Sequence, residues 1–315
     1  MCPPSSPKVS VVLASYNQAP YLRQAIDSIL GQAFDDYELI IVDDGSSDGS
    51  RELIEDIVAR HPGRVRFCHH LNHRNLGISP TYLLGIGAAR GAYVAFLEGD
   101  DRWGPNYLGG KVAALDRHPD VGVVFSRYRI LSGGFYGCDM AFRQWILGLF
   151  TIPHRPFNNV GHLMMRNNVA TFSAFVARKS LLDQSPLTLP REILFFDWWV
   201  LLQLGMRSKF FLDQASVVEW RQHPGSALGK QKLASHKAML GRFMQVMYEE
   251  IGRNLNLLNE RDRARYLRNN ALLPRFVSFY EQPGAGRFLA FFVRAPLWAL
   301  ASLASYCVNH WKFSR

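Results

Sequence analysis

The sequence predicts an α/β protein in which helices cover a mostly parallel central sheet. Hydrophobic residues make up 48% and charged residues 20% of the 315 residues, which is the balance of a folded chain with a buried core. Short β-rich runs alternate with helical patterns in the first part of the chain, a sign of parallel strands joined by helices. Polar clusters follow three of these runs, at the positions where ligands of such sheets bind.

The first two strand and helix pairs follow from the spacing of apolar residues. The run VSVVLA at residues 9–14 predicts a buried strand, and the apolar spacing i, i+3, i+4, i+7 after it predicts a helix that ends at Gly31. YELIIV at residues 37–42 predicts the second strand. The turn DDGSSDGS then leads into a second helix, which Asp48 or Ser50 can cap.

The later elements carry weaker signals. Three further strands are expected, at residues 65–68, 93–97 and 121–125. Residues 132–166 lack a clear periodicity and are expected to form loops with a short helix at 145–149, which is typical of a region that binds a variable partner. The remaining expected elements are a strand at 171–177, a helix at 197–204, a strand at 209–212, and helices over about the last eighty residues.

The net charge is spread unevenly along the chain. Of the total of +10, residues 1–213 carry +1 and residues 214–315 carry +9. A near-neutral body with a basic end favours contact with an anionic membrane surface over binding of nucleic acid. Residues 288–308 are apolar but interrupted by Arg294 and Pro296, so they predict an interfacial helix and not a span; packing on the body or dimerisation would use the same residues.

The cysteines and the start of the chain bear on the compartment. Cys2, Cys68, Cys138 and Cys307 lie far apart without a CxxC pair, which argues against a zinc knuckle, a redox dithiol and a disulfide-stapled fold. The opening residues MCPPSSPK lack the apolar stretch of a signal peptide. These observations predict a cytoplasmic protein, and the basic end of the chain predicts that it is peripheral on the cytoplasmic face of the membrane.

Three polar clusters are expected to converge at one edge of the sheet. They are residues 15–17 after the first strand, Asp43 and Asp44 after the second, and residues 98–101 after the fourth. Ligands of open α/β sheets bind beyond the carboxyl ends of the strands. Clustered carboxylates need a cation or hydrogen-bond donors between them, and hard oxygen ligands of this kind suit Mg²⁺ or Mn²⁺ together with substrate phosphates.

Five segments carry a resemblance to a known family. They are SVVLASYN (10–17), ELIIVDDGSSDGS (38–50), AYVAFLEGDDRWGP (92–105), FFDWWVLLQLG (195–205) and WRQHPGS (220–226). In this order they resemble family 2 glycosyltransferases of the GT-A fold. The resemblance implies a GT-A domain over residues 1–226, with a nucleotide-binding half at about 8–130 and an acceptor-binding half at about 131–226. A helical basic region at 227–315 would follow.

The resemblance also implies roles for single residues. Asp197 would be the catalytic base, or alternatively a cap of the helix that follows it. Asp100 and Asp101 would hold the divalent ion. Substrate would be bound by Ala14, Tyr16, Asn17, Asp43, Asp44, Glu98, Gly99, Arg221 and His223. Structural roles are the alternatives: a capped turn for DDGSSDGS, a polar loop for residues 98–101, and a surface salt bridge and a solvated histidine for Arg221 and His223.

Two positions depart from the family pattern. Glu98 stands where the metal-binding signature usually has an aspartate. Thr81, Tyr82 and Leu83 stand where Ala-Arg-Asn is usual. The usual arginine reaches the nucleotide, so that contact is lost or moved in this chain.

The implied function is inverting transfer of a sugar from a nucleotide-diphosphate donor, a UDP-sugar in the first instance, to a hydroxyl acceptor. The acceptor would be a saccharide or a lipid-linked saccharide in bacterial-type surface polysaccharide or glycolipid synthesis, and Mg²⁺ or Mn²⁺ would be the cofactor. A non-catalytic nucleotide-sugar-binding protein of the same fold is the alternative. A nicotinamide-dependent oxidoreductase is disfavoured, because GIGAARG at residues 85–91 closes a helix where a dinucleotide loop would open one.

Overall fold

The computed structural model describes residues 6–71, 74–131, 155–164, 169, 171–190, 193–223, 225–226 and 233–281. The helix expected at 145–149 and the apolar segment at 288–308 lie outside these residues. The chain divides into two compact units, residues 1–159 with 168–222 and residues 160–167 with 223–315.

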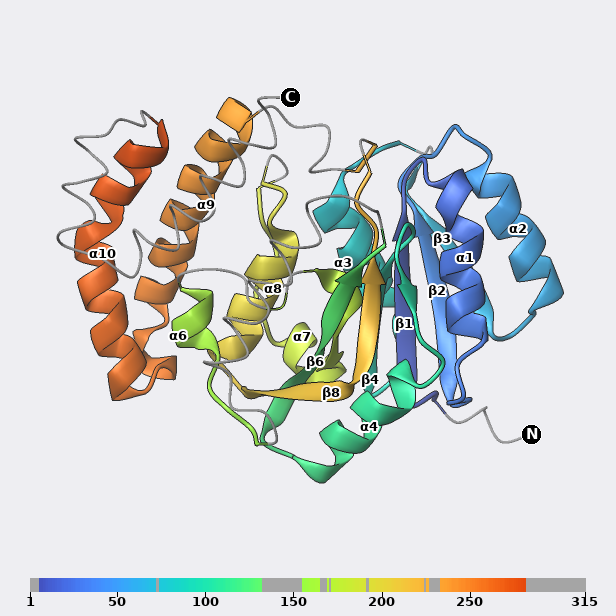
Figure 1. Cartoon of the computed structure of the whole chain (residues 1–315), viewed down its shortest axis with the longest axis horizontal. Helices are drawn as coiled ribbons and strands as arrows, with labels where there is room; N and C mark the ends of the chain where they lie inside the picture. Colours follow the sequence, from blue (N-terminus) through green and yellow to red (C-terminus); the bar gives the residue numbers. More distant parts are fainter. Residues whose placement is uncertain are drawn as a thin grey trace. The chain divides into compact units, whose positions relative to one another are not determined.

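The first unit is built on one mixed sheet (Figure 1). Its strands are β1 (Val9–Ser15), β2 (Tyr37–Asp43), β3 (Val65–His69), β4 (Tyr93–Glu98), β5 (Arg102–Trp103), β6 (Val121–Ile130), β7 (Phe175–Arg178) and β8 (Lys209–Trp220). Their order in space is β3-β2-β1-β4-β7-β6-β8-β5. The first four of this order are mutually parallel, β7 is antiparallel to both of its neighbours, and β8 is parallel to β6. The predicted fold class is confirmed.

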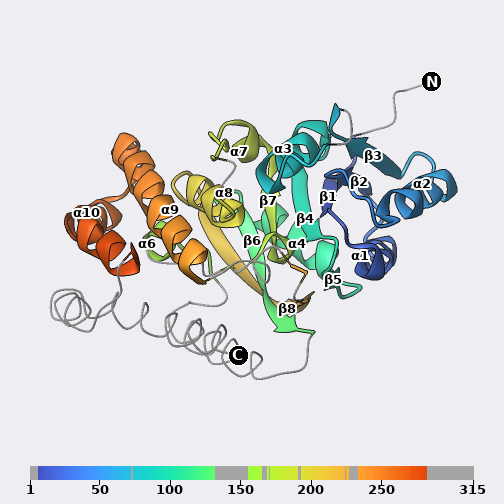
Figure 2. The same ribbon diagram turned by 90° about the horizontal axis from the view of Figure 1, so that it is seen from above.

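Helices cover both faces of this sheet (Figure 2). α3 (Ile78–Ala88) lies on one face, where a Cβ atom at Gly85 would stand 2.3 Å from Val12, so the helix approaches β1 as closely as glycine permits. α1 and α4 lie on the other face. The helices of this unit besides α3 are α1 (Ala19–Leu30), α2 (Ser50–Arg60), α4 (Tyr107–Arg117), the 3₁₀ helix η2 (Phe172–Ala174), α7 (Lys179–Asp183) and α8 (Phe196–Gly205).

The core lies between the parallel strands and these helices. Every residue of β2 is buried, which explains its continuous apolar run. α1 buries one stripe, composed of Leu22, Ala25, Ile26 and Ile29, at the spacing that predicted it. Buried runs and stripes of this kind are why the strands at 9–14, 37–42, 65–68 and 93–97 were predicted to within a residue or two.

The strand expected at 171–177 is in part wrong. Phe172–Ala174 form the 3₁₀ helix η2, and the strand β7 begins only at Phe175. The Ser173 hydroxyl accepts a hydrogen bond from the backbone amide of Glu98, the last residue of β4, and donates one to Asp101 in the loop after it. β6 and β8 extend beyond the expected ends at 125 and 212, because the two strands pair with each other as far as Ile130 and Trp220.

The predicted cap of α2 is also wrong. The N-cap is Gly49, whose φ of 90° is in the left-handed region that favours glycine. Asp48 instead accepts hydrogen bonds from the backbone amide of Ala19, at 2.9 Å, and from the amide and hydroxyl of Ser50. The acid therefore joins the turn before α2 to the start of α1.

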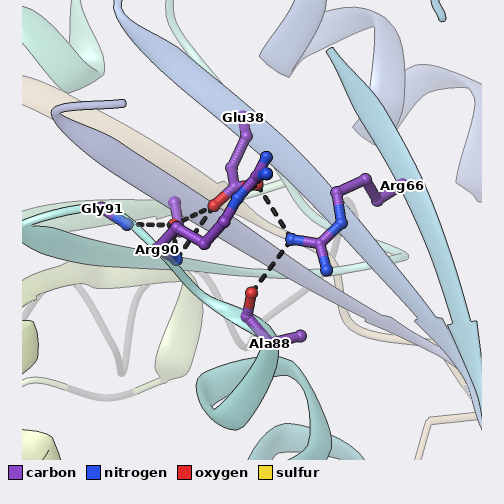
Figure 3. A network of polar contacts seen from close by, with 6 residues as sticks. Glu38, Arg66, Ala88, Arg90 and Gly91 are labelled. Carbon is purple, nitrogen blue, oxygen red and sulfur yellow. Dashed lines mark hydrogen bonds and ion pairs between the residues drawn. The ribbon is translucent and has the colours of Figure 1, made fainter. Parts of the chain in front are cut away.

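A buried polar network holds the amino-terminal end of the parallel strands (Figure 3). Glu38, the second residue of β2, is 2% exposed and accepts hydrogen bonds from Ser10, Arg66 and Arg90. Arg66 also donates to the carbonyl of Ala88 at the end of α3. The network thus ties the end of α3 to β1, β2 and β3.

The second unit is helical. It contains α6 (Val160–Leu163), α9 (Leu233–Arg253), the 3₁₀ helix η3 (Leu255–Leu257) and α10 (Glu260–Glu281). α9 packs on α10, with the rings of Tyr248 and Tyr266 stacked 5.7 Å apart, and the Tyr248 hydroxyl donates to the carbonyl of Met164. None of the described helices is long and apolar enough to cross a membrane.

Candidate active site

The three predicted polar clusters do meet at one edge of the sheet. β1 lies between β2 and β4, in a register that pairs Ser15 with Asp43 and Ala14 with Glu98. Beyond these pairs the backbone amide of Gly99 donates to the carbonyl of Ala14, at 3.0 Å. The ends of the three strands are therefore held side by side, as the sheet order requires.

The two acids after β2 have different partners. Asp43 is buried and accepts hydrogen bonds from the backbone amides of Gly45 and Ser46 and from the Ser46 hydroxyl, so it closes the turn. Asp44 reaches across to the loop before α3 and accepts from the amides of Leu76, at 2.7 Å, and Gly77, at 2.9 Å.

Asp44 is electrostatically unusual. Burial raises its pKa above the ordinary value, against the opposing effect of the two amides and of the nearby His70. The His70 ring lies 3.6 Å from the Asp44 carboxylate and 3.1 Å from the hydroxyl of Thr81. Asp44 therefore joins β2, β3 and α3 at this edge.

The cluster after β1 lines the same edge. Tyr16 is 41% exposed, as a residue available for a ligand would be. Asn17 has a φ of 52° and exchanges hydrogen bonds with the turn after β2: its amide donates to Ser46 Oγ, and its side chain accepts from the amide of Ser47. Asn17 thus fixes the position of Tyr16 relative to that turn.

Residues 98–101, called the acidic loop below, are held by η2. Thr171 donates to Oε2 of Glu98, and Ser173 both accepts from the Glu98 amide and donates to Oδ2 of Asp101, at 2.6 Å. Burial and the charge of Asp100 raise the pKa of Glu98 to about 8, and the same causes raise the pKa of Asp101 well above its ordinary value. The charged forms of these acids are therefore disfavoured in the free protein, and a cation or hydrogen-bond donors would stabilise them.

Gly99 permits the close approach of this loop to β1. A Cβ atom at this position would lie 2.4 Å from Oε1 of Gln18 and 3.2 Å from the Leu22 side chain. Any larger residue would push the acidic loop away from the start of α1.

Arg221 is attached to the acidic loop. Its backbone amide donates to Oδ1 of Asp101 at 2.8 Å, and its side chain donates to the carbonyl of Asp100 and to Gln24. The guanidinium group also lies over the ring of Tyr21, 4.7 Å from its centroid. His223 follows two residues later and is half-buried.

Asp197 stands in the first turn of α8, after the N-cap residue Phe195. Its carboxylate accepts a hydrogen bond from the amide of Trp198, at 2.7 Å, and is half-buried. Its charge contributes to raising the pKa of Glu98. Asp197 is therefore close to the acidic loop as well as part of the helix start.

The residues on η2 were not predicted as part of the site. Thr171 and Ser173 bond the acidic loop from more than seventy positions away in the sequence. The only signal was the presence of two hydroxyl residues inside the apolar run TFSAFV.

Unsatisfied polar atoms gather around this edge. Among the described residues, five buried side-chain atoms have no hydrogen-bond partner, and four of them belong to β1, the turn after it, or α3: Ser15 Oγ, Gln18 Oε1, Ser79 Oγ and Tyr82 Oη. Buried polar groups are normally paired, so unmet hydrogen-bonding capacity marks a place that a ligand can complete.

The carboxylate oxygens at this edge are ligands of the kind that Mg²⁺ and Mn²⁺ prefer. Their mutual repulsion would be reduced by such an ion. Within the described ranges, however, no three His, Cys, Asp or Glu side chains are arranged to hold a metal by themselves. Mg²⁺ bound by such carboxylates usually keeps several water ligands and takes substrate phosphate oxygens as well.

Comparisons with known proteins agree with this arrangement. The model of glycosyl transferase family 2 matches residues 10–175. An uncharacterized protein of Mycobacterium tuberculosis is 29% identical over 218 residues, which are 68% of this chain and 59% of that protein. An uncharacterized glycosyltransferase of Nostoc sp. is 36% identical over 137 residues, 44% of this chain and 41% of that one. The match thus spans less than two thirds of these relatives.

Two solved structures share the fold. TarS residues 1–349 of S. aureus, in complex with UDP-GlcNAc, has a TM-score of 0.63 and 17% identity, covering 90% of this chain and 75% of that one. A mannosyltransferase from Pyrobaculum calidifontis, in complex with GDP-Man and Mn²⁺, has a TM-score of 0.62 and 16% identity, covering 97% and 81%. With the family model covering more than half of the sequence, the chain belongs to glycosyl transferase family 2 and has the GT-A fold.

Proposed function

We propose that this chain transfers a sugar from a nucleotide-diphosphate donor to a hydroxyl acceptor, with inversion at the anomeric carbon. The observation that carries the proposal is the convergence of Asp44, the acidic loop and Asp197 at one edge of the sheet, among buried polar atoms that lack partners. A binding site with separate groups for a base, for phosphates and for a sugar needs this combination.

The donor would lie across the ends of β1, β2 and β4. Tyr16 offers an exposed ring for the nucleotide base. Asp44 accepts hydrogen bonds from two backbone amides, and a carboxylate has about four acceptor positions, so it can accept further hydrogen bonds from the nucleotide. The complexes of solved neighbours with UDP-GlcNAc and with GDP-Man support a nucleotide sugar as the ligand class, with a UDP-sugar as the first choice.

The divalent ion would be held by Asp100. Both oxygens of Asp101 accept protein hydrogen bonds, from Ser173 and from the amide of Arg221, so Asp101 would have to give up one of them to bind the ion. When bound, a Mg²⁺ or Mn²⁺ ion would neutralise negative charge on the diphosphate. The complex of the P. calidifontis neighbour with Mn²⁺ supports this choice.

Asp197 would act as the general base. The charge of Asp197 acts on Glu98 of the acidic loop. Its Oδ1 accepts a hydrogen bond from the Trp198 amide in the first turn of α8, which orients the carboxylate before substrate binds. In the reaction Asp197 accepts the proton of the acceptor hydroxyl, the oxygen bonds to the anomeric carbon, and the bond from that carbon to the diphosphate breaks. Arg221 orders the acidic loop through its contacts to Asp100 and Asp101.

The acceptor would be a saccharide or a lipid-linked saccharide of bacterial-type surface polysaccharide or glycolipid synthesis. The net charge of +9 over residues 214–315 supports peripheral attachment to an anionic membrane surface on the cytoplasmic side, where a lipid-linked acceptor would be met. Binding of the full chain to vesicles containing anionic lipid, compared with neutral vesicles, tests this part independently.

A donor panel tests the central proposal. The full chain is incubated with MnCl₂ and with UDP-, GDP- and other nucleotide-linked sugars, and release of nucleoside diphosphate is measured. Slow release from one donor without acceptor, increased by a suitable saccharide, is the expected result. Binding of a donor without release under any condition would instead support the non-catalytic alternative, and absence of binding would contradict both.

A further inference from the structure

Tyr82 is a fully buried tyrosine whose hydroxyl lacks a partner. Its ring stacks on Phe172 of η2, with centroids 4.0 Å apart, and meets Phe96 of β4 edge-on. Among the described residues, no atom forms a hydrogen bond with its hydroxyl. A buried tyrosine hydroxyl usually has a hydrogen-bond partner. The unpaired hydroxyl of Tyr82 therefore lowers the stability of the ligand-free protein.

Tyr82 packs against the two segments that hold Glu98: Phe172 follows Thr171, which donates to Glu98, and Phe96 precedes Glu98 by two residues on β4. The charges that act on Tyr82 are those of Glu98, Asp101, Asp100 and Asp197, with Glu98 the strongest of the four. Burial, followed by these charges, raises the pKa of Tyr82 well above its ordinary value, so the hydroxyl keeps its proton. Towards carboxylates it can only donate.

Glu98 has the matching unfilled position. Thr171 donates to its Oε2, whereas its Oε1 accepts no hydrogen bond from the described residues. Thr171 is the neighbour in sequence of Phe172, on which Tyr82 stacks. The hydroxyls of Thr171 and Tyr82, which would hold the two oxygens of Glu98, therefore belong to residues that are packed together.

We propose that Tyr82 is a positioning residue for the sugar donor. Once a nucleotide sugar is bound, the Tyr82 hydroxyl donates a hydrogen bond to Glu98. Tyr82 and Thr171 together then hold this carboxylate against a hydroxyl group of the sugar. The inference rests on the proposed function, because it assumes that a nucleotide sugar binds at the acidic loop. It adds a residue that stands where relatives usually carry arginine, and assigns it a role that acts through Glu98.

The variant Tyr82→Phe removes only the hydroxyl and keeps the ring stack. Its thermal midpoint should equal or exceed that of the unchanged protein, because an unpaired hydroxyl has been removed. Binding of UDP-GlcNAc or GDP-mannose in MnCl₂, measured by calorimetry, should weaken by about tenfold, the usual effect of losing a hydrogen bond to a charged group. The donor KM for hydrolysis should rise by a similar factor.

Tyr37→Phe is the matched control. Tyr37 is also buried, but its hydroxyl donates to the carbonyl of Ile29 at 2.9 Å, and it begins β2 at the opposite end of the strand from the site. This variant should lower the thermal midpoint and leave donor binding unchanged. A lowered midpoint in Tyr82→Phe with unchanged donor binding would overturn the inference and assign the hydroxyl a purely structural role.

A double-mutant cycle tests whether Tyr82 acts through Glu98. In a Glu98→Ala background, the further change Tyr82→Phe should have no additional effect on donor binding. Equal effects of Tyr82→Phe in both backgrounds would contradict the proposed pairing. If the unchanged protein binds none of the nucleotide sugars in the donor panel, the proposed function fails. If it binds one and Tyr82→Phe binds that donor equally well, only this inference fails.

Discussion

The backbone amide of Arg221 donates a hydrogen bond to Oδ1 of Asp101, over 2.8 Å and 120 positions of sequence. The other oxygen of Asp101 accepts from Ser173, whose carbonyl in turn accepts from Trp103 and Tyr107. Asp101 is therefore a buried cross-link that fixes the acidic loop to η2 and to the end of β8.

The variant Asp101→Asn should destabilise the protein. The amide oxygen can still accept one of the two hydrogen bonds, but the NH₂ group would face the other donor. We expect the free energy of unfolding to fall by about 1–3 kcal/mol. Urea denaturation measures this loss. The surface variant Asp120→Asn, which removes an exposed pair with Lys209, should leave stability almost unchanged. Equal stability of both variants would show that the cross-link contributes nothing.

Glu38→Gln should also destabilise, and in a pH-dependent way. Burial raises the pKa of Glu38, but hydrogen bonds from Arg90, Ser10 and Arg66 outweigh it, and the pKa ends below the ordinary 4.5. Its stabilising contribution is thus present above that value and is lost as the pH falls through the folded pKa. At pH 7 the variant should lose about 2 kcal/mol, a value reduced because Arg66 and Arg90 are partly exposed.

The pH dependence is the decisive measurement for Glu38. The difference in unfolding free energy between the unchanged protein and Glu38→Gln should shrink below about pH 4.5. Donor binding at pH 7 should be retained, because the network lies at the opposite end of the strands from the acidic loop. A difference that stays constant down to the acid transition would contradict the role of the charge.

Lys111→Met tests a buried ion pair whose effect on stability also rises with pH, but in an alkaline range. Lys111 is fully buried on α4, with its Nζ atom 3.2 Å from Asp213 and 2.7 Å from the hydroxyl of Ser216. Burial lowers its pKa from 10.5 to about 8, although Asp213 opposes the shift. Between these values the unfolded chain binds a proton that the folded protein has lost, so stability should rise with pH, by up to about 3 kcal/mol.

Denaturant unfolding of the two proteins across this range provides the measurement. The unchanged protein should gain stability relative to Lys111→Met between about pH 8 and 10.5. Lys209→Met, which removes a surface lysine, should keep the gain. If the stability curves of the unchanged protein and Lys111→Met run parallel, the lysine is not the source of the effect.

The sequence could predict the parallel part of the sheet because β1, β2 and β4 are buried over almost their whole length. The edge strand β3 is mostly half-buried. β5 could not be predicted: it has two residues, and it exists only because Arg102 and Trp103 pair with Glu219 and Val218 of β8. The same is true of the last part of β6, which alternates exposed and half-buried residues and depends on β8 for its pairing.

The candidate site also has a part that the sequence could predict and a part that it could not. Acids that directly follow buried strands, such as Asp44 and Asp100, could be located because the topology of a parallel sheet brings strand ends together. The partners that fix them could not, because Thr171 and Ser173 come from a segment whose local pattern predicted a strand. Hydrogen bonds between side chains that are far apart in the sequence produce no periodic pattern from which they could be predicted.

Asp100→Ala should remove the metal dependence of donor binding. In the proposed site this carboxylate is the protein ligand of the ion, whereas Asp101 is occupied by Ser173 and Arg221. Calorimetry with UDP-GlcNAc and GDP-mannose, in MnCl₂ and in EDTA, should show a difference for the unchanged protein and none for the variant. The same dependence in Asp100→Ala would place the ion on another group.

Asp197→Asn should abolish sugar transfer while donor binding remains. The amide has the size of the carboxylate and can still accept from Trp198, but it cannot take the acceptor proton. Loss of a general base lowers the rate by about 10²–10⁴-fold. Transfer is measured by nucleoside diphosphate release with acceptor present, and donor binding by calorimetry. Asp183→Asn, which removes an exposed carboxylate paired with Lys179, should leave both unchanged. Undiminished transfer by Asp197→Asn would mean that another group removes the proton.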